Sequence, residues 1–339
     1  MSEPSRKDRA TGAIMGALIG DALALGCHWY YDVAAQREDC GEWISDYRDS
    51  DPERTDRFGY IARLRYEEGL RAGDLSQTGQ IARILLESMA QMSGYDEAEF
   101  TRRLDELFTT LDGESLSGRF TDRAVKDTWK NRQAGIAWGE AGSATDTAEA
   151  AIWCVSLAAN ATDDMRELAI QAGEAIKLTH SNPYIAGYSL AYVLGAAALM
   201  NGVGLDQIRE HMTELYRDPQ IGERTSSVDI MFQIGNEAAC MGADRSLDLD
   251  PVIACRLMGM NCTIGFLMPA AYFLIHRYPD DFEMAVLSAV NAGGNNMARA
   301  ALVGALSGAL VGIDGIPERL ITGLKDHEHL LDAARRVAR

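Results

Sequence analysis

The sequence predicts an all-α protein, and three observations support this fold class. Apolar residues recur at helical spacing along most of the 339 residues, whereas the alternating pattern of a strand is nearly absent. Glycines recur at every fourth residue in one segment near each end of the chain. No linker or internal repeat divides the sequence, so we expect one compact multi-helix domain over residues 1–339.

The glycine rows predict two helices that each have a bare backbone face. The rows are Gly12, Gly16 and Gly20 near the N-terminus, and Gly304, Gly308 and Gly312 near the C-terminus. Residues at i, i+4 and i+8 share a helix face, so a partner helix can approach closely there. Such rows also occur in membrane dimers, but both segments are too short to span a bilayer. Close packing inside one interlocked helical core is therefore the preferred interpretation.

The remaining segments divide into expected helices and loops. The apolar periodicity predicts helices over 79–92, 96–108, 148–159, 163–179, 184–200, 205–215, 226–241, 251–258, 263–276, 281–290 and 297–311. Glycine, aspartate and serine content predicts loops over 40–57, 71–77, 111–119, 139–146, 242–250 and 291–296.

The charge balance restricts the partners that the protein can bind. Thirty-two Lys and Arg against 50 Asp and Glu give a formal net charge of −18, which opposes binding to nucleic acid or to an anionic membrane. A local basic pocket for one phosphate stays compatible with this balance. The charged N-terminus lacks a secretory signal pattern, and the six cysteines form no C-x-x-C pair. We therefore expect a cytoplasmic protein with reduced, mostly buried thiols.

The first candidate site segment follows the N-terminal glycine row. Asp21 stands inside an otherwise apolar helix, and a buried acid is costly unless it is paired. It is either satisfied by a helix cap or an arginine, or it is a pocket acid with a tuned pKa. The stretch CHWYYD, residues 27–32, follows it and contains His28 and Trp29. Its aromatic residues predict either a stacking wall or ordinary core.

Two further loop–helix junctions collect polar residues. The stretch 73–80 opens a helix, where Ser76 or Thr78 is a plausible N-cap, and capping alone explains it. The stretch 291–296 holds Gly293 and Gly294, which let a ligand approach the backbone, and asparagines that both donate and accept. Arg299 follows one turn later. The segments 143–147 and 179–183 between these junctions, with Asp146, His180 and Asn182, are ordinary capping motifs when taken singly.

Taken together, these segments resemble the ADP-ribosylglycohydrolase superfamily. GALIGDALALG is similar to that family's opening helix, GALxGDALG, and LTHSNPYIAGYSLAYVLGAAAL to a second family segment. Residues 261–324 follow its C-terminal third, so the resemblance covers most of the chain in the right order. It implies an all-α fold with a central cleft at the helix ends, where the segments described above come together.

The sequence departs from this family at the metal-binding motifs. Family members hold two Mg²⁺ ions with a TDDT and a GGDTDTN motif. The aligned residues here are 75–78, LSQT, and 293–299, GGNNMAR, which contain no carboxylate. Mg²⁺ requires hard anionic oxygens, so we expect no metal and no other cofactor. The CHWYYD stretch, the Gln-Thr pair and the Ala-Arg pair after the double glycine resemble the J1-crystallin-like branch of the superfamily.

Three functional hypotheses remain open from the sequence. The preferred one is a metal-independent hydrolase, or a related lyase, that acts on a glycosidic bond. Its substrate is an ADP-ribose- or nucleoside-like small molecule, with or without a phosphate. The second is a non-catalytic ligand-binding or structural protein. The third is a Mg²⁺-dependent ADP-ribosyl hydrolase whose ligands have moved, for example to Asp21, Asp74 and Asp146. A homo-oligomer is compatible with all three.

The preferred hypothesis assigns roles to individual residues. Asp21 and Asp146 are the candidate catalytic carboxylates, and His28 and His180 are the candidate proton carriers, with His180 assigned to the catalytic set. Arg299 is expected to bind a phosphate or carboxylate in place of the metal. The full set of candidate substrate-binding residues is His28, Trp29, Gln77, Thr78, Asn182, Asn291, Gly293, Gly294, Asn295, Asn296 and Arg299.

Overall fold

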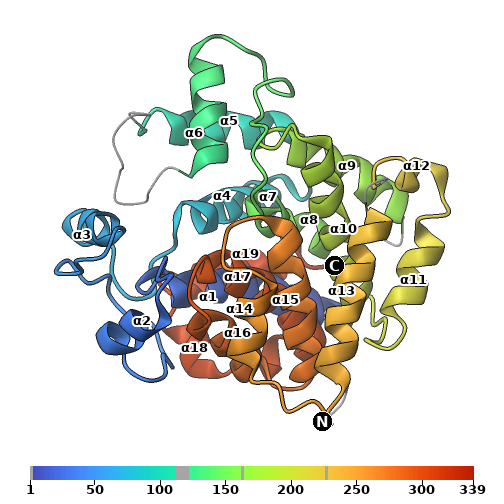
Figure 1. The fold of residues 1–339 in the computed structure, drawn as a ribbon. Helices are drawn as coiled ribbons and strands as arrows, with labels where there is room; N and C mark the ends of the chain where they lie inside the picture. Colours follow the sequence, from blue (N-terminus) through green and yellow to red (C-terminus); the bar gives the residue numbers. More distant parts are fainter. Residues whose placement is uncertain (1–2, 112–121, 162–163, 226–227) are drawn as a thin grey trace.

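A computed structural model describes residues 3–111, 122–161, 164–225 and 228–339, without the side chains of 228–234 (Figure 1). Within these residues the secondary structure is helical, apart from two isolated β-bridges that join Ser143 to His180 and Thr147 to Thr263. The predicted all-α fold class is confirmed.

The helices follow one another along the whole chain. The first half contains α1 (Arg6–Leu25), α2 (Val33–Cys40), α3 (Gly59–Glu67), α4 (Gln77–Met92), α5 (Glu97–Phe108), α6 (Arg123–Gln133), α7 (Glu149–Trp153), α8 (Val155–Asn160) and α9 (Met165–Lys177). The second half contains α10 (Pro183–Met200), α11 (Ile208–Leu215), α12 (Pro219–Gly222), α13 (Val228–Ala243), α14 (Pro251–Met258), α15 (Ile264–Arg277), α16 (Phe282–Asn291), α17 (Asn296–Val311), the 3₁₀ helix η1 (Ile313–Gly315), α18 (Glu318–Thr322) and α19 (His327–Val337).

The glycine rows of α1 and α17 pack directly against each other at the centre of the fold. A Cβ atom on Gly16 would lie 2.0 Å from the carbonyl oxygen of Gly304, and a Cβ on Gly304 would lie 2.0 Å from that of Gly16. The same relation holds for Gly12 and Gly308, at 2.4 and 2.1 Å. The two backbones are thus in contact along this face, and any side chain there would separate them. This confirms the close packing that the two rows predict.

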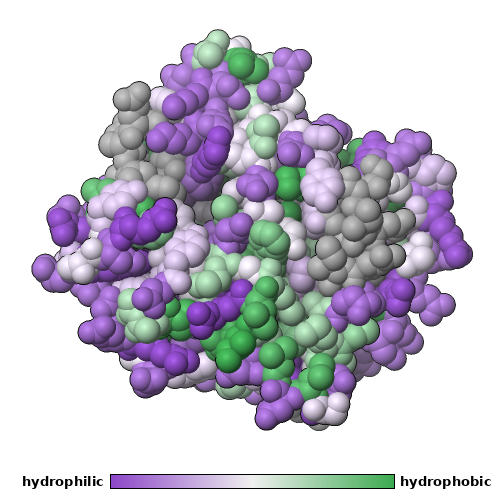
Figure 2. All heavy atoms as spheres, viewed as in Figure 1, coloured by the Kyte–Doolittle hydropathy of each residue, from purple (hydrophilic) through white to green (hydrophobic). Residues whose placement is uncertain are grey.

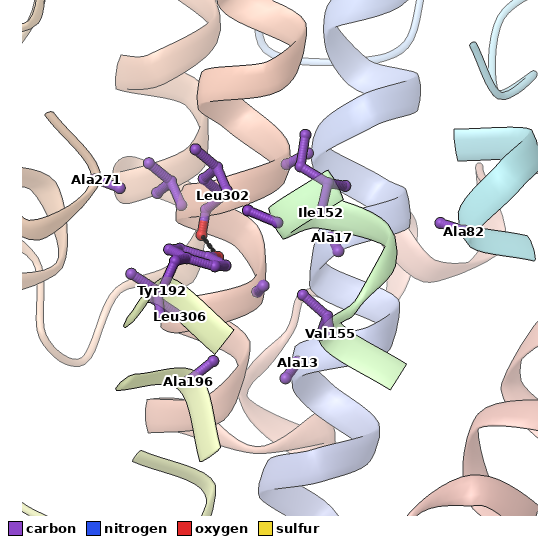
Figure 3. Packing of buried hydrophobic residues seen from close by; sticks show 14 of the residues in the cluster. Ala13, Ala17, Ala82, Ile152, Val155, Tyr192, Ala196, Ala271, Leu302 and Leu306 are labelled. Atoms are coloured by element: carbon purple, nitrogen blue, oxygen red, sulfur yellow. Dashed lines mark hydrogen bonds between the residues drawn. The ribbon is translucent and has the colours of Figure 1, made fainter. Parts of the chain in front are cut away.

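Helix α10 completes this core. Its 18 residues are long and apolar enough to cross a membrane by length and composition, but 83% of them are buried inside the protein. Its Tyr192 hydroxyl donates a 2.7 Å hydrogen bond to the carbonyl oxygen of Leu302 in α17 (Figure 3). Its apolarity is therefore that of a core helix.

The structure differs from the predicted helices in two ways: one expected helix is interrupted, and several helices are present that the sequence did not predict. The expected helix 148–159 is interrupted at Cys154, which separates α7 from α8. Helices α2, α3, α6, α12, α18 and α19 were not expected from the sequence. α2 is a typical case, because it is short, half of its residues are polar, and its N-terminus is capped by a side chain. Asp32 Oδ1 accepts from the main-chain nitrogens of Ala34 and Ala35. Most of the expected loop 111–119, residue 163 of the expected helix 163–179, and residues 226–227 of the expected helix 226–241 lie outside the described residues.

The face shown in Figure 2 is mainly hydrophilic, with a larger apolar area near its lower centre. This area lies over α14 and α15, where Ile253, Leu257 and Phe266 are exposed. The hydrophilic remainder fits a chain with an excess of acidic residues.

Candidate functional site

A small cavity lies where several helix ends meet. Its volume is about 20 Å³, which is enough for one water molecule. Gln77 and Asn295 both line it, so the two family-like motifs do come together as the sequence predicts. The full set of lining residues is His28, Trp29, Arg65, Ser76, Gln77, Thr78, Asp122, Glu149, Asn295 and Met297.

Three long helices begin at this cavity. Gln77 is the first residue of α4, Asp122 caps α6, and Asn295 caps α17. The free main-chain N–H groups and the dipole of each helix favour negative charge or an electronegative atom at this end. The positions of these three side chains therefore follow from helix capping, while their convergence follows from the tertiary fold.

Asp21 lies behind the wall of the cavity. Its carboxylate accepts hydrogen bonds from the main-chain nitrogen of Ser76 at 2.8 Å and from the Ser76 hydroxyl at 2.5 Å. This contact requires a glycine at position 79, because a Cβ there would lie 2.3 Å from Asp21 Oδ2. Asp21 is therefore a buried acid satisfied by a helix N-terminus, which is one of the two alternatives that the sequence left open. It does not line the cavity.

Arg65 carries a buried positive charge into the cavity wall. It is 4% exposed, and its Nη1 donates to the carbonyl oxygen of Leu25 at 3.2 Å. Its buried Nε has no hydrogen-bond partner among the described residues. Burial lowers the pKa of Arg65 to about 10, and the nearby carboxylate of Asp21 opposes this shift. Sequence reasoning missed this residue, because nothing in the surrounding charged helix distinguishes it.

Two carboxyl groups that sequence reasoning also missed face the cavity. Asp122 Oδ1 accepts from the main-chain nitrogen of Val125 at 2.9 Å, whereas its Oδ2 is buried without a partner in the described structure. Glu149 is 5% exposed, and its Oε2 likewise has no hydrogen bond within the described part of the chain. Burial, and next the charge of Glu149, raise the pKa of Asp122 well above its usual range. Glu149 was detectable in principle, as an acid inside the apolar run 148–159, but Asp122 has no local signal.

Gln77 connects these groups. Its Oε1 accepts from the main-chain nitrogen of Asp122 at 2.7 Å. Its Nε2 is buried and has no partner among the described residues. With its oxygen engaged, the amide keeps both N–H donors of Nε2 for the cavity. The neighbouring Thr78 is also buried in the cavity wall.

His28 and Trp29 close another side. His28 Nδ1 lies 3.0 Å from Asn296 Oδ1. Burial, together with the charge of Arg65, holds the pKa of His28 well below its usual range. Trp29 has a φ of 64°, an uncommon conformation for a bulky residue, and such strain is concentrated at functional sites. The strained backbone is held at both ends, since its nitrogen donates to Gly294 and its oxygen accepts from Arg54.

The other expected catalytic residues occupy different places. His180 is fully buried, 3.0 to 3.1 Å from the hydroxyls of Thr179 and Thr147, with its Nε2 3.5 Å from Glu149 Oε2. It thus contacts the cavity through Glu149. Asp146 is exposed and accepts from the Thr263 hydroxyl. Asn182 caps α10. Neither Asp146 nor Asn182 lines the cavity, contrary to the expected role of each.

The double-glycine loop is occupied by the protein's own contacts rather than open to a ligand. Asn291 bonds both main-chain groups of Ile44, and Asn296 donates to the carbonyl oxygens of Cys27 and Val290. Gly293 and Gly294 have φ of 68° and 63°, and Cβ atoms there would lie 2.6 and 2.3 Å from carbonyl oxygens of Tyr30 and Met260. The glycines therefore allow the chain, not a substrate, to come close.

Arg299 also departs from its expected role. It is fully buried, and its Nη atoms donate to the carbonyl oxygens of Ala289, Gly293 and Gly259. Within the described structure only its Nε lacks a hydrogen-bond partner. Arg299 does not line the cavity. Its guanidinium holds the loop in place, so the structure gives it a structural role instead of the expected anion contact.

The residues present do not fit the pair of Mg²⁺ ions that the family resemblance implies. The Ser76 hydroxyl already donates a hydrogen bond to Asp21. The other aligned residues at the cavity are Gln77, Asn295 and Met297, which are neutral and lie beside the cation Arg65. Among the described residues, no group of three His, Cys, Asp or Glu side chains is placed to hold a metal. Asp74, a candidate relocated ligand, pairs with Lys325 at 2.9 Å.

Comparisons with known proteins agree with this fold. A solved structure titled "ADP-ribosylglycohydrolase-related protein complex" matches 98% of this chain and 98% of its own, with a TM-score of 0.64 and 18% identity. A protein of Archaeoglobus fulgidus, described as uncharacterized, is 24% identical over 331 residues, which are 98% of this chain and 96% of that protein. The sequence profile of the ADP-ribosylglycohydrolase family matches residues 2–339. The chain belongs to the ADP-ribosylglycohydrolase family.

Proposed function

We propose that the protein hydrolyses a glycosidic bond of a small molecule without a metal ion. The observation that carries this proposal is the pair of carboxyl groups, Asp122 and Glu149, whose free oxygens are buried at one cavity. Cleavage of a glycosidic bond needs an acid for the leaving group and a base for water, and a pair of carboxyl groups can supply both.

The surroundings of the two carboxyl groups assign their roles. Burial next to Glu149 favours the protonated form of Asp122, so Asp122 is the general acid. Glu149 is the general base, positioned by the imidazole of His180, 3.5 Å away. Asp122 is positioned through its main-chain nitrogen by Gln77. Asp21 and His180 therefore support the reacting groups rather than react.

The substrate class follows from the family rather than from the cavity. Family membership supports an ADP-ribose-like compound, and the aromatic side chain of Trp29 at the cavity also suits a nucleoside. Two of the stretches that carry the resemblance to the J1-crystallin-like branch, CHWYYD and the Gln-Thr pair, supply residues to the cavity wall. These residues, His28, Trp29, Gln77 and Thr78, carry no carboxylate, which supports a reaction without Mg²⁺.

The proposal is tested with a substrate panel in the presence of EDTA. Purified protein is incubated with ADP-ribosyl-arginine, with ADP-ribosylated protein and with the common nucleosides, and release of the sugar is followed by chromatography. We expect EDTA-resistant turnover of one of these classes, lost in Asp122→Asn and Glu149→Gln. Glu174→Gln is the matched control, since this carboxylate is exposed and pairs with Lys177 on α9. Turnover that requires Mg²⁺, or that persists in both carboxyl variants, contradicts the proposal.

A second candidate function is favoured by the size of the cavity. At about 20 Å³ it is too small for a sugar ring, so a non-catalytic member of the fold would present the same structure. Calorimetric titration with ADP-ribose separates the two: binding without turnover of any class in the panel supports a ligand-binding protein.

A further inference from the structure

We propose that the cavity binds one water molecule through the Nε of Arg65, the Nε2 of Gln77 and the Oε2 of Glu149, and that this water attacks the glycosidic bond. The binding half of this inference, that the cavity holds a water molecule, is independent of the proposed function. The catalytic half, that this water attacks the glycosidic bond, rests on the proposed function. Each of the three atoms is buried without a hydrogen-bond partner in the described part of the chain, and each residue lines the same cavity.

The size of the cavity favours a single water molecule. A volume of about 20 Å³ exceeds the space that one water needs and is far below that of a sugar or a phosphate. The three residues are at most 5% exposed, so bulk solvent does not satisfy their free atoms. Buried water typically makes about three hydrogen bonds to groups of this kind.

The chemistry of the wall selects water over other small occupants. Arg65 and Gln77 each offer an N–H donor, which cannot ligate a cation. The carboxylate of Glu149, the proposed base, repels an inorganic anion. A water molecule accepts from the two N–H groups and donates to Glu149, and its second O–H remains directed elsewhere in the cavity.

In this arrangement Arg65 stabilises negative charge on the attacking water, as a metal ion does in Mg²⁺-dependent hydrolases. When Glu149 removes a proton, negative charge develops on the water oxygen, and the guanidinium next to it stabilises that charge. The N-termini of α4, α6 and α17 also lie at the cavity and add positive potential there. Arg65 is thus proposed as a catalytic residue, since it contacts the reacting water.

The step balances without any further reactant. One O–H bond of water breaks and its proton goes to Glu149, while the oxygen forms a bond to the anomeric carbon. The glycosidic bond breaks, and the leaving atom takes the electron pair and the proton from Asp122. A second water then returns the proton from Glu149 to Asp122. Because the water attacks directly, the product has inverted anomeric configuration.

A high-resolution crystal structure of the full chain tests the binding half. Crystals are grown once with EDTA and once with millimolar MgCl₂. We expect one spherical density peak in both, at roughly 2.7–3.2 Å from the Arg65, Gln77 and Glu149 atoms. We expect this peak to be lost in Gln77→Leu and in Arg65→Met, and retained in Glu174→Gln. Contacts of roughly 2.0–2.1 Å that appear only with MgCl₂ identify a metal ion and overturn the inference. Direct bonds among the side chains, with no peak, also overturn it.

The catalytic half is tested on whichever panel substrate is turned over. We expect Gln77→Leu to lower kcat by roughly 10²-fold with little change in KM, as for removal of one transition-state donor. Gln77→Glu, which keeps the shape of the side chain, serves if the leucine variant does not fold. NMR of the first-formed product should show inversion. Retention, or an unchanged kcat, overturns the catalytic half. A crystallographic water without turnover of any substrate contradicts the proposed function and leaves the binding half intact.

Discussion

Two groups of buried polar residues lie near the helix ends: the double-glycine side, residues 291–299, and the cavity side, formed by the cavity wall. They differ in whether their polar atoms are hydrogen-bonded to other residues. On the double-glycine side, Asn291 and Asn296 bond to main-chain groups and Arg299 donates to three carbonyl oxygens. On the cavity side, donors and acceptors of Arg65, Gln77, Asp122 and Glu149 that have no hydrogen bond among the described residues meet at one cavity. Both sides contain buried polar residues, and the sequence alone does not tell which of them lack a hydrogen bond.

This difference separates structural from functional polarity. A buried polar group that is fully bonded contributes to stability, whereas an unbonded one costs about 1–3 kcal/mol and is retained for another reason. Residues of the first side should therefore be needed for folding. Residues of the second side should be needed for activity, at some cost in stability.

The largest expected effect is on the cavity side, in the variant Glu149→Gln. Turnover should fall by roughly 10²- to 10⁴-fold, because the general base is lost. The melting temperature should not fall, because Glu149 Oε2 has no hydrogen bond to another described residue that the amide would lose. Calorimetry and turnover measured on the same preparation check both halves. A lower melting temperature would place Glu149 with the structural residues.

The matching experiment on the double-glycine side is Asn291→Ala. Both main-chain groups of Ile44 and the carbonyl oxygen of Leu287 lose a partner in a buried place. We expect a loss of about 2–4 kcal/mol in the free energy of unfolding, measured by urea denaturation. Ser181→Ala, at an exposed position, is the control and should stay within about 0.5 kcal/mol of the wild type. An equally small effect of Asn291→Ala would remove the proposed distinction between the two sides.

A smaller effect is expected in the pH dependence of stability. Because the folded pKa of Asp122 is raised, the folded protein binds more protons at this site than the unfolded chain above about pH 4. The contribution of Asp122 to stability is therefore favourable at low pH and is lost as the pH rises through the folded pKa. Asp122→Asn should flatten this part of the profile, measured as urea midpoints between about pH 4 and about pH 7. An unchanged slope would show that Asp122 is ionised in the folded protein.

The parts of the structure that sequence reasoning could predict are those with a local, periodic signal. The face-to-face contact of Gly16 and Gly304 follows from two rows of glycines, because helix periodicity alone decides which residues share a face. The capping positions of Ser76 and Asn295 likewise depend only on their neighbours in the chain. These elements agree with expectation for that reason.

The cavity itself depends on contacts between segments far apart in the chain. Arg65, Asp122 and Glu149 come from three separate segments. Arg65 and Asp122 are ordinary charged residues in their surroundings, whereas Glu149 stands out as an acid inside an apolar run. Conversely, Arg299 has a suggestive position after a glycine loop, but its guanidinium turns to nearby carbonyl oxygens. Which buried polar atoms remain unbonded is a property of the packed structure, and no sequence pattern specifies it.

The smallest expected effect is that of Mg²⁺ on the wild-type protein. An ion that binds only the folded state raises the free energy of unfolding by RT ln(1 + [L]/Kd), about 2.7 kcal/mol at a hundredfold excess over Kd. The cavity offers neutral Gln77 and Asn295 beside the cation Arg65, so millimolar Mg²⁺ should leave the melting temperature almost unchanged. Gln77→Asp is the matched variant, because it adds a third carboxylate beside Asp122 and Glu149. This variant should gain a measurable Mg²⁺-dependent shift. A large shift in the wild type, lost in Asp21→Asn or Asp146→Asn, would show instead that the metal ligands have moved, and it would make a Mg²⁺-dependent reaction the better account of this cavity.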